Sequence, residues 1–311
     1  MQVGFIGLGA MGAHLAGHLQ ARGLLSVVGN RSLAKAQVLA ETLDVRAAAI
    51  AADFADCDLV MLCVSADADV LENVRALAGV LKPGSVVIDH STVAMQTAQT
   101  AHALLKEKNI GFLDAPVSGG VEGAKNGKLS IMVGGDAADL EKARPALDSY
   151  ALRITHMGAS GAGQATKAVN QVLVAGIAQA VCEGLALGDK LGLSAELLVP
   201  TLAAGAAGNW FLDKRGATML AGNYTPGFKS GLLHKDLKIV REMATQIAGI
   251  IGRPDLLQFG AYQPTATDPP YVVADNAKLQ TTGWKPRYDL ATGLRETIEW
   301  WRQAPLAARA R

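Results

Sequence analysis

The residues best suited to chemistry lie near the start of a long apolar stretch. Lys167, Asn170 and Gln171 occupy positions i, i+3 and i+4, so a helix would place them on one face. A lysine inside such an apolar helix is unfavourable unless its ammonium group is paired or used. Desolvation would lower its pKa towards the range that serves proton transfer. The pattern alone leaves two interpretations open: Lys167 is an acid/base, or its side chain extends to reach solvent.

Two further segments carry polar groups. Asp114-Ala-Pro-Val-Ser118-Gly119-Gly120 follows a predicted strand, and its serine and glycines would expose N–H groups and a hydroxyl suited to a carboxylate, although this composition is common in loops. Leu233-His-Lys-Asp-Leu237 is a charged cluster in a helical run, where His234 is more often structural than catalytic. The sequence shows no metal-ligand cluster, nucleophile elbow or P-loop motif, so we expect no metal.

A glycine-rich turn near the N-terminus is typical of dinucleotide binding. The run Gly7-Leu8-Gly9-Ala10-Met11-Gly12 lies between an apolar strand candidate and a helix-compatible stretch. Gly7 permits a tight turn, Gly9 lets the backbone approach a pyrophosphate, and Gly12 lets helix and strand pack closely. N–H groups at the helix start would then bind phosphate. The placement of the motif therefore predicts a dinucleotide site.

The end of the second predicted strand favours NADP over NAD. An acidic residue about 20 residues after the glycines usually binds the ribose 2′-hydroxyl. Here the sequence is Asn30-Arg31-Ser32, and no Asp or Glu occurs before Glu41. Arg31 offers a guanidinium to a 2′-phosphate, and Asn30 and Ser32 could donate hydrogen bonds. Arg31 could instead be a solvated loop residue, but we expect NADP.

The first 160 residues or so alternate short apolar runs with helical stretches. This alternation predicts a doubly wound, mostly parallel sheet with its ligands at the carboxyl edge. The predicted strands are Val3–Ile6, Leu25–Val28, Leu59–Val64, Ser85–Asp89, Gly111–Asp114, Ser130–Val133 and Arg153–His156.

Beyond Gly161 the pattern becomes helical. Gly161–Leu191 is predicted to be one long connecting helix that is buried on most sides because it is apolar nearly all round, under a second helical domain and in part by a subunit partner. The other predicted helices are Ser194–Ala204, Phe211–Leu220, Leu232–Ala248 and Leu290–Gln303. The expected fold class is α/β: an N-terminal Rossmann-type doubly wound sheet, a long connecting helix, and an all-α second domain with an atypical C-terminal tail. The expected domains are 1–160, 161–250 and 251–311.

Composition points to a soluble, cytoplasmic protein. Half of the chain is hydrophobic, 18% is charged and the net charge is +1, so no feature favours nucleic acid as a partner. Cys57, Cys63 and Cys182 lack zinc or CxxC spacing and are expected to be free thiols, the last two buried. The N-terminus lacks a signal-peptide pattern, and the uncharged stretch Ala168–Cys182 is too short to span a membrane.

These motifs, in this order and spacing, resemble the β-hydroxyacid dehydrogenase family. That family includes 3-hydroxyisobutyrate dehydrogenase, tartronate semialdehyde reductase and the glyoxylate/succinic semialdehyde reductases. The matching stretches cover roughly residues 1–245: GFIGLGAMG at 4–12, NRS at 30–32, IDHST at 88–92, DAPVSGG at 114–120, GKLSIMVGG at 127–135, GAGQATKAVNQ at 161–171 and FKSGLLHKDL at 228–237.

The resemblance implies a role for each site residue. Lys167 would be the general acid/base, Ser118, Gly119 and Gly120 would hold a substrate carboxylate, and Asn170 with Gln171 would orient the substrate. Val64 and Ser65 would contact the cofactor, Thr92 would lie near its nicotinamide, and Lys235 would lie near the nicotinamide end. Many members have Asn four residues after the lysine. Gln171 stands there in this chain, as in the tartronate semialdehyde reductase branch.

The tail departs from this family. Residues 251–311 are similar to the C-terminal part of extended short-chain dehydrogenases, the nucleotide-sugar epimerases and dehydratases. That chemistry needs a Tyr-x-x-x-Lys pair, and none of the five tyrosines has a lysine four residues on. The tail therefore supplies no epimerase catalysis, and the chain is interpreted as a chimera with a truncated helical domain. Its proline-rich residues 261–274 are expected to be extended or disordered.

The sequence thus predicts an oxidoreductase that transfers hydride between NADP(H) and a small β-hydroxy acid or semialdehyde bearing a carboxylate. We expect a homodimer or homotetramer with no membrane or nucleic-acid partner. Two alternatives remain: a catalytically impaired NADP-binding chimera, and an enzyme like the imine reductases. Lys167 argues against the second, because those enzymes typically carry a different residue there.

Overall fold

The computed structural model describes residues 1–223, 230–250 and 254–257. They form two compact units, each described here by itself. The first contains Met1–Ala180 and Thr225–Leu257, and the described part of the second begins at Val181 and ends at Asn223.

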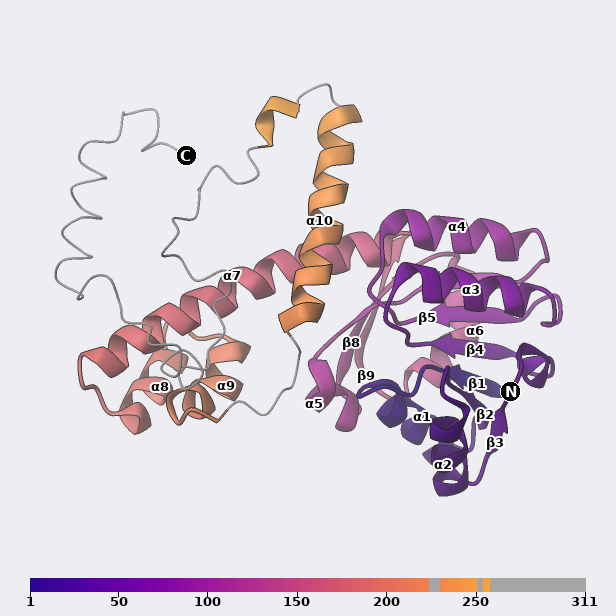
Figure 1. Ribbon diagram of the computed structural model, residues 1–311, viewed down its shortest axis with the longest axis horizontal. Coiled ribbons are helices and arrows are strands. Elements are labelled where there is room, and N and C mark those ends of the chain that lie inside the picture. The colour runs from indigo at the N-terminus through magenta and orange to yellow at the C-terminus, as the bar shows by residue number, and fades with distance from the viewer. Residues whose placement is uncertain (224–229, 251–253, 258–311) are drawn as a thin grey trace. The chain divides into compact units, whose positions relative to one another are not determined.

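A nine-stranded sheet forms the centre of the first unit (Figure 1). Its parallel part runs in the order β3-β2-β1-β4-β5-β6, and β8 follows antiparallel to β6, pairing with antiparallel β7 and parallel β9. The strands are β1 (Val3–Ile6), β2 (Leu25–Gly29), β3 (Arg46–Ala48), β4 (Leu59–Leu62), β5 (Val86–Asp89), β6 (Gly111–Asp114), β7 (Val117–Ser118), β8 (Leu129–Gly134) and β9 (Ala151–Gly158). The order reverses at β1, so the expected doubly wound, mostly parallel sheet is confirmed.

Helices cover both faces of this sheet and bury a separate core on each. The helices are α1 (Gly12–Ala21), α2 (Leu33–Leu43), α3 (Asp67–Ala78), α4 (Met95–Lys106), α5 (Gly120–Lys125) and α6 (Ala137–Leu147), with a 3-10 turn at Ala51–Phe54. On one face, Leu15 and Leu19 of α1 pack with Leu140 of α6. On the other face, Val74 of α3 packs with Ala101 and Leu105 of α4. The parallel strands are therefore buried on both sides, as their continuous apolar runs predict.

All seven predicted strands are present, with ends shifted by up to two residues. Two strands were not predicted, Arg46–Ala48 and Val117–Ser118. Both are short and lie towards an edge of the sheet. The register of β7 places Ser118 opposite Ser130 of β8, so Ser118 lies in a strand and not in the loop that the sequence predicts.

The long helix α7 (Ala162–Lys190) confirms the predicted connecting helix, whereas its burial by a subunit partner stays a prediction. Val169 is 62% exposed and Leu173 is 60% exposed, so an extensive apolar surface of α7 lies open. Its length also removes the argument that its apolar stretch is too short to cross a membrane. By length and composition alone, α7 could cross a membrane. The core helix of a soluble protein can meet the same two criteria, and 22% of the most apolar 18-residue stretch of α7 is buried.

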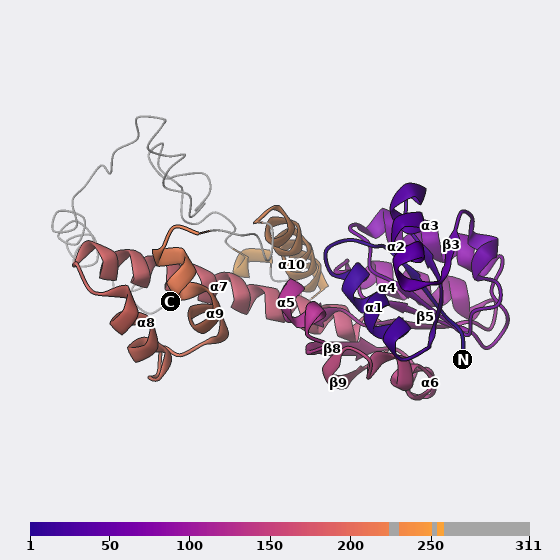
Figure 2. The ribbon, with the colours of Figure 1, turned by 90° about the horizontal axis from the view of Figure 1, so that it is seen from below.

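In the part of the chain that the structure describes, three more α-helices follow α7. In the second unit, α8 (Ala195–Ala203) and α9 (Trp210–Leu220) pack on the C-terminal half of α7 through Val181, Leu185, Val199 and Leu212 (Figures 1 and 2). The first unit contains α10 (Ser230–Ile250) and a 3-10 turn at Pro254–Leu256. The predicted helix Leu290–Gln303 and the predicted extended segment 261–274 lie outside the described residues, as does most of the tail.

The three cysteines are free thiols, as predicted. Cys57 is buried, but Cys63 and Cys182 are only half-buried. The prediction that Cys182 is buried was therefore wrong. The Cys63 thiol itself is desolvated, since burial raises its pKa to about 12, even though part of the residue is exposed.

The turn between β1 and α1 explains the spacing of its glycines. Gly7 has a φ of 100°, in the left-handed region that favours glycine. A Cβ built on Gly12 would overlap the carbonyl oxygen of Gly7, whereas one built on Gly9 would meet nothing within 4 Å. Gly7 and Gly12 are thus required by the turn itself, and Gly9 leaves open space beside it.

We predict opposite effects on stability for alanine at two glycines of α1. Gly12→Ala forces a clash with the Gly7 backbone and should lower the free energy of unfolding by about 1–3 kcal/mol. Gly17→Ala, the matched control, has no atom within 4 Å of its new Cβ and should raise it by about 0.5–1 kcal/mol through helix propensity. Urea unfolding of the cofactor-free protein measures both. Equal effects of the two substitutions would contradict this account.

Candidate active site

Asp114 anchors the helix that carries the lysine. Its carboxylate lies at the carboxyl end of β6 and accepts hydrogen bonds from the Gly161 N–H (2.7 Å) and the Gln164 N–H (2.9 Å). These N–H groups belong to the first turn of α7 and have no partner within the helix. Burial raises the pKa of Asp114, and the N–H donors oppose this by stabilising the anion. The start of α7 is therefore fixed to the edge of the sheet.

Lys167 lies one turn further along α7 and is buried. Its side chain is 8% exposed, and its Nζ donates a hydrogen bond to the carbonyl oxygen of Val117 at 2.9 Å. Desolvation lowers its pKa to about 8, with Lys235 contributing in the same direction and Asp236 opposing it. Of the two interpretations left open by the sequence, the one in which Lys167 reaches solvent does not describe this structure.

The predicted substrate residues lie beside the lysine. Ser118 Oγ donates to Asn170 Oδ1 at 3.4 Å, and Asn170 Nδ2 donates to Gln171 Oε1 at 2.8 Å. Gly119 and Gly120 follow with φ values of 131° and 62°, which only glycine adopts without strain. The loop after β7 and one face of α7 therefore converge, as the i, i+3, i+4 spacing predicts.

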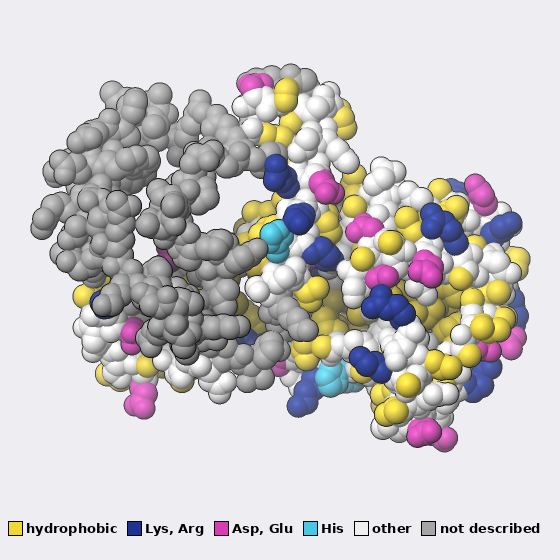
Figure 3. Space-filling model, viewed as in Figure 1, with side chains coloured by type: hydrophobic (Ala, Val, Ile, Leu, Met, Phe, Trp, Pro, Cys, Tyr) yellow, Lys and Arg dark blue, Asp and Glu magenta, His cyan; other side chains and the backbone are white. Residues whose placement is uncertain are grey.

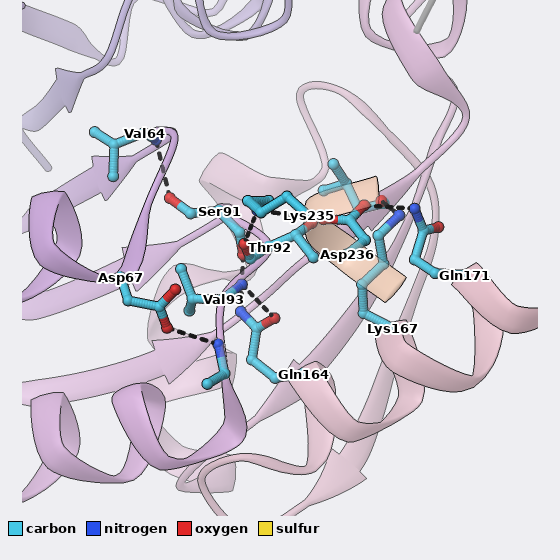
Figure 4. Close-up of polar contacts among 12 residues, drawn as sticks. Val64, Asp67, Ser91, Thr92, Val93, Gln164, Lys167, Gln171, Lys235 and Asp236 are labelled. Carbon is cyan, nitrogen blue, oxygen red and sulfur yellow. Dashed lines mark hydrogen bonds and ion pairs between the residues drawn. The ribbon is translucent and has the colours of Figure 1, made fainter. Parts of the chain in front are cut away.

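Helix α10 contributes a buried acidic residue that the sequence reasoning did not select. Asp236 is 4% exposed, and its Oδ2 accepts a hydrogen bond of 2.6 Å from Gln171 Nε2 (Figure 4). Its Oδ1 lies 3.2 Å from the ammonium of Lys235. Lys235 in turn donates to the carbonyl oxygen of Thr92. No local pattern in the sequence singles out Asp236, because its partner Gln171 lies 65 residues away in the chain.

The loop after β5 connects these groups to the cofactor side of the sheet. Ser91 Oγ accepts a hydrogen bond from the Val64 N–H at 2.9 Å, which ties the loop after β4 to the loop after β5 (Figure 4). Ser65 lies next in the chain and is exposed. Apart from Lys235 of α10, the predicted cofactor residues follow β1, β2, β4 and β5, so they share the carboxyl edge of the parallel sheet.

A neutral histidine, His90, stabilises the loop after β5 through hydrogen bonds to buried groups. His90 is 3% exposed, and burial lowers its pKa to about 4. Its Nδ1 lies 2.7 Å from the Ala115 carbonyl oxygen and must donate there, so Nε2 accepts from the Tyr150 hydroxyl at 2.8 Å. The backbone after β5 is thus fixed to the backbone after β6. Sequence reasoning gave no role to either ring.

The glycine turn fits a dinucleotide. The Leu8 N–H donates to Asn30 Oδ1 at 3.1 Å, so Asn30 holds the turn beside the open space at Gly9. Asn30 Nδ2 donates to the Ser32 carbonyl oxygen at 3.3 Å. The Arg31 side chain is 94% exposed, and its nearest acidic partner is Asp69 of α3, at 3.9 Å. Asp69 therefore lies near the guanidinium, although the end of β2 itself carries no carboxylate.

Positive charge gathers next to this site. Figure 3 shows Lys, Arg and His side chains over α10, which carries His234, Lys235, Lys238 and Arg241. Such a surface favours the approach of anionic ligands. Among residues 1–223, 230–250 and 254–257, no group of three or more His, Cys, Asp or Glu side chains could hold a metal ion.

Comparison with known proteins gives the same picture. A family model described as the NAD binding domain of 6-phosphogluconate dehydrogenase matches residues 2–158, and one described as NAD-binding of NADP-dependent 3-hydroxyisobutyrate dehydrogenase matches residues 161–250. NAD-dependent L-serine dehydrogenase of Pseudomonas aeruginosa is 37% identical over 253 residues, 78% of this chain and 85% of that protein.

Solved structures agree with these matches. The structure of Mycobacterium tuberculosis 3-hydroxyisobutyrate dehydrogenase with L-serine has a TM-score of 0.70 and 32% identity, over 80% of this chain and 88% of that one. A structure described as Psf3 in complex with NADP+ and 2-OPP has a TM-score of 0.72 and 28% identity, over 77% of this chain and 86% of that one.

A Rossmann-type sheet with a glycine turn, joined to helices that carry the buried polar cluster, defines an NAD(P)-dependent oxidoreductase. Within that class the chain belongs to the 3-hydroxyisobutyrate dehydrogenase family of β-hydroxyacid dehydrogenases. The resemblance expected from the motifs is confirmed. Both matched ranges end by residue 250, so the likeness of the tail to epimerases stays a prediction.

The buried lysine should make stability depend on pH. Between pH 8 and 10.5 the folded state releases the Lys167 proton while the unfolded chain still binds it. The unfolded state then holds more protons, so the free energy of unfolding should rise with pH, by about 3 kcal/mol at most. Urea unfolding of the parent and of Lys167→Met at several pH values isolates this contribution, because Lys167→Met lacks it.

Lys106→Met, at an exposed position of α4, is the control and should follow the parent at every pH. If the difference between the parent and Lys167→Met does not change from pH 8 to 10.5, Lys167 is not desolvated.

Proposed function

We propose that this protein interconverts a small β-hydroxy acid and the matching semialdehyde or keto acid with NADP(H), and that Lys167 is its general acid/base. The observation that carries the proposal is the buried Lys167 ammonium, 2.9 Å from the carbonyl oxygen of Val117 in β7, next to Ser118. NADP(H), when bound, supplies or accepts the hydride at nicotinamide C4. The other steps belong to side chains of this chain.

Lys167 is suited to moving a proton at the reacting oxygen. A pKa of about 8 keeps both of its protonation states accessible near neutral pH. In the direction of reduction the ammonium donates a proton to the oxygen of the carbonyl group. In the direction of oxidation the neutral amine accepts the hydroxyl proton. Since an ammonium has three N–H donors, Lys167 can keep its bond to Val117 while it contacts substrate.

The remaining polar groups hold and orient the substrate. The Ser118 hydroxyl and the N–H groups of Gly119 and Gly120 bind the carboxylate, and Asn170 with Gln171 faces the hydroxyl-bearing carbon. The bond between Gln171 and Asp236 fixes the Gln171 amide, so its orientation is set before substrate arrives. Positioning and charge stabilisation of this kind supply the catalysis.

Turnover by the parent and by Lys167→Met tests this function. NADPH oxidation is measured with glyoxylate and with succinic semialdehyde, methylmalonate semialdehyde and tartronate semialdehyde. NADP+ reduction is measured with 3-hydroxyisobutyrate and with L-serine. Lys167→Met should lower kcat by about 10²–10⁴-fold and leave NADPH binding intact. In the parent, the rate of reduction should fall as pH rises through about 8, and the rate of oxidation should rise.

Two results would lead elsewhere. NADPH binding without turnover of any of these compounds favours a catalytically impaired chimera. Turnover of a cyclic imine alone, unaffected by Lys167→Met, favours an enzyme like the imine reductases.

The preference for NADP rests on Arg31. Its exposed guanidinium follows β2, where a ribose 2′-phosphate would lie, and Asp69 is 3.9 Å away. A carboxylate so placed competes with a 2′-phosphate for Arg31 and also repels it. The Arg31 guanidinium therefore strengthens NADP binding, and the Asp69 carboxylate weakens it.

Matched substitutions separate these two charges. Arg31→Ala should raise KM for NADPH by about tenfold or more and leave KM for NADH nearly unchanged, because only the 2′-phosphate needs the guanidinium. Asp69→Asn should lower KM for NADPH by removing the competing carboxylate. Steady-state kinetics with both cofactors measures the ratio of KM for NADPH to KM for NADH in each variant. A parent protein that prefers NADH, with Arg31→Ala unchanged, would assign the chain to the NAD-dependent members.

A further inference from the structure

Gln164 is buried between the helix of the lysine and the loop after β5. It is 2% exposed, and both ends of its side-chain amide are bonded to backbone of that loop. Its Nε2 donates to the Ser91 carbonyl oxygen at 2.8 Å, and its Oε1 accepts from the Val93 N–H at 3.2 Å (Figure 4). These two backbone groups flank Thr92, the residue expected beside the nicotinamide.

The loop is held on its other side as well. Ser91 and Val93 present their backbone groups to Gln164, whereas Thr92 presents its carbonyl oxygen to Lys235 of α10. Backbone groups that alternate in this way belong to an extended segment. A side-chain amide is suited to the Ser91 carbonyl oxygen and the Val93 N–H because it offers one donor and one acceptor in one plane. Helices α7 and α10 therefore hold the backbone of Thr92 from two sides.

The same helix positions the proton donor. Gln164 and Lys167 are three residues apart on α7, so they share a face and are about one turn apart. The Gln164 N–H is also bonded to Asp114, which fixes this turn to the sheet. The height of the Thr92 loop relative to the Lys167 ammonium is thus set by one rigid turn of helix and one amide.

We propose that Gln164 is a positioning residue that sets the nicotinamide ring of the cofactor at the correct distance from the substrate held at Lys167. The proposal rests on the function proposed above. Gln164 touches neither reacting atom. It fixes the backbone on which the ring lies, and hydride transfer depends steeply on that placement. Binding of the adenosine end of the cofactor, at the glycine turn, does not involve it.

The experiment compares Gln164→Met, Gln164→Glu and the control Gln96→Met, which lies on the exposed side of α4. Met has nearly the same length and loses both bonds. Glu keeps the acceptor for the Val93 N–H and, when ionised, loses the donor for Ser91. For each variant, kcat is measured with the best substrate, and Kd is measured for NADPH and for 2′-phospho-ADP-ribose, which lacks the nicotinamide. The deuterium isotope effect with [4-²H]NADPH reports on the hydride step.

We expect both Gln164 variants to lower kcat by about 10- to 100-fold and to increase the isotope effect, while Kd for 2′-phospho-ADP-ribose stays within about twofold of the parent. Gln96→Met should match the parent in all three measurements. A general loss of structure would weaken NADPH and the fragment together, and that result would overturn the proposal. So would a kcat within about twofold of the parent.

The two proposals fail in different ways. If the parent turns over no substrate, the proposed function fails, and the isotope effect cannot be measured on any variant. If the parent is active and the Gln164 variants are equally active, only the role of Gln164 is wrong. Should Gln164→Met not fold, Gln164→Glu decides, because it retains a polar group and one of the two bonds.

Discussion

The bond between one carboxylate and the first turn of α7 is the constraint on which the site depends. Asp114 lies at the end of β6, inside the best-packed part of the protein, and α7 carries Gln164, Lys167, Asn170 and Gln171. A carboxylate at a helix N-terminus is favourable because it accepts otherwise unpaired N–H groups and interacts with the helix dipole. Removing it from water is unfavourable, as the raised pKa of Asp114 shows. The donors compensate for that burial only while helix and strand keep their relative position.

Hydrogen bonds join this anchored helix to two backbone segments and to one side chain of α10. Lys167 binds the backbone of β7, Gln164 binds the loop after β5, and Gln171 binds Asp236 of α10. Desolvation outweighs the attraction of Asp236 at Lys167, which is why the pKa of the lysine falls. The side chain that the chemistry needs is thus held in a state that a surface lysine does not reach. The hydrogen bond to Val117 stabilises the buried ammonium, and the exclusion of water lowers its pKa.

Sequence reasoning predicted the parts of this arrangement that repeat with a period or form a motif. The strands were found because a buried parallel sheet needs continuous apolar runs, and the spacing of Lys167, Asn170 and Gln171 placed them on one face. Strand β7 was missed because two residues carry no pattern. Asp236 and Gln164 were missed for another reason: their importance comes from partners 65 and 73 residues away, Gln171 and Ser91, which no local pattern shows.

Within the single chain, α7 turns its polar side and not its apolar side towards the sheet. Within two turns its buried residues include Gln164, Lys167 and Gln171, while Val169 and Leu173 are exposed. Amphipathicity alone would bury the apolar side and expose the polar one. Here hydrogen bonds to strands and loops bury the polar side, so hydropathy alone does not show which side of α7 packs on this chain. The exposed apolar side is where burial by a subunit partner was expected.

This arrangement also bears on which evolutionary changes the helix can absorb. Substitutions alter one side chain at a time, but inserting or deleting one residue between Gly161 and Lys167 turns everything beyond it by about 100° about the helix axis. Because Asp114 holds the first turn, the rotation cannot be relieved at that end. The lysine would leave its position, and Ala168 after a deletion or Thr166 after an insertion would take its place. Between Gly161 and Lys167, evolution should therefore accept substitutions more readily than insertions or deletions.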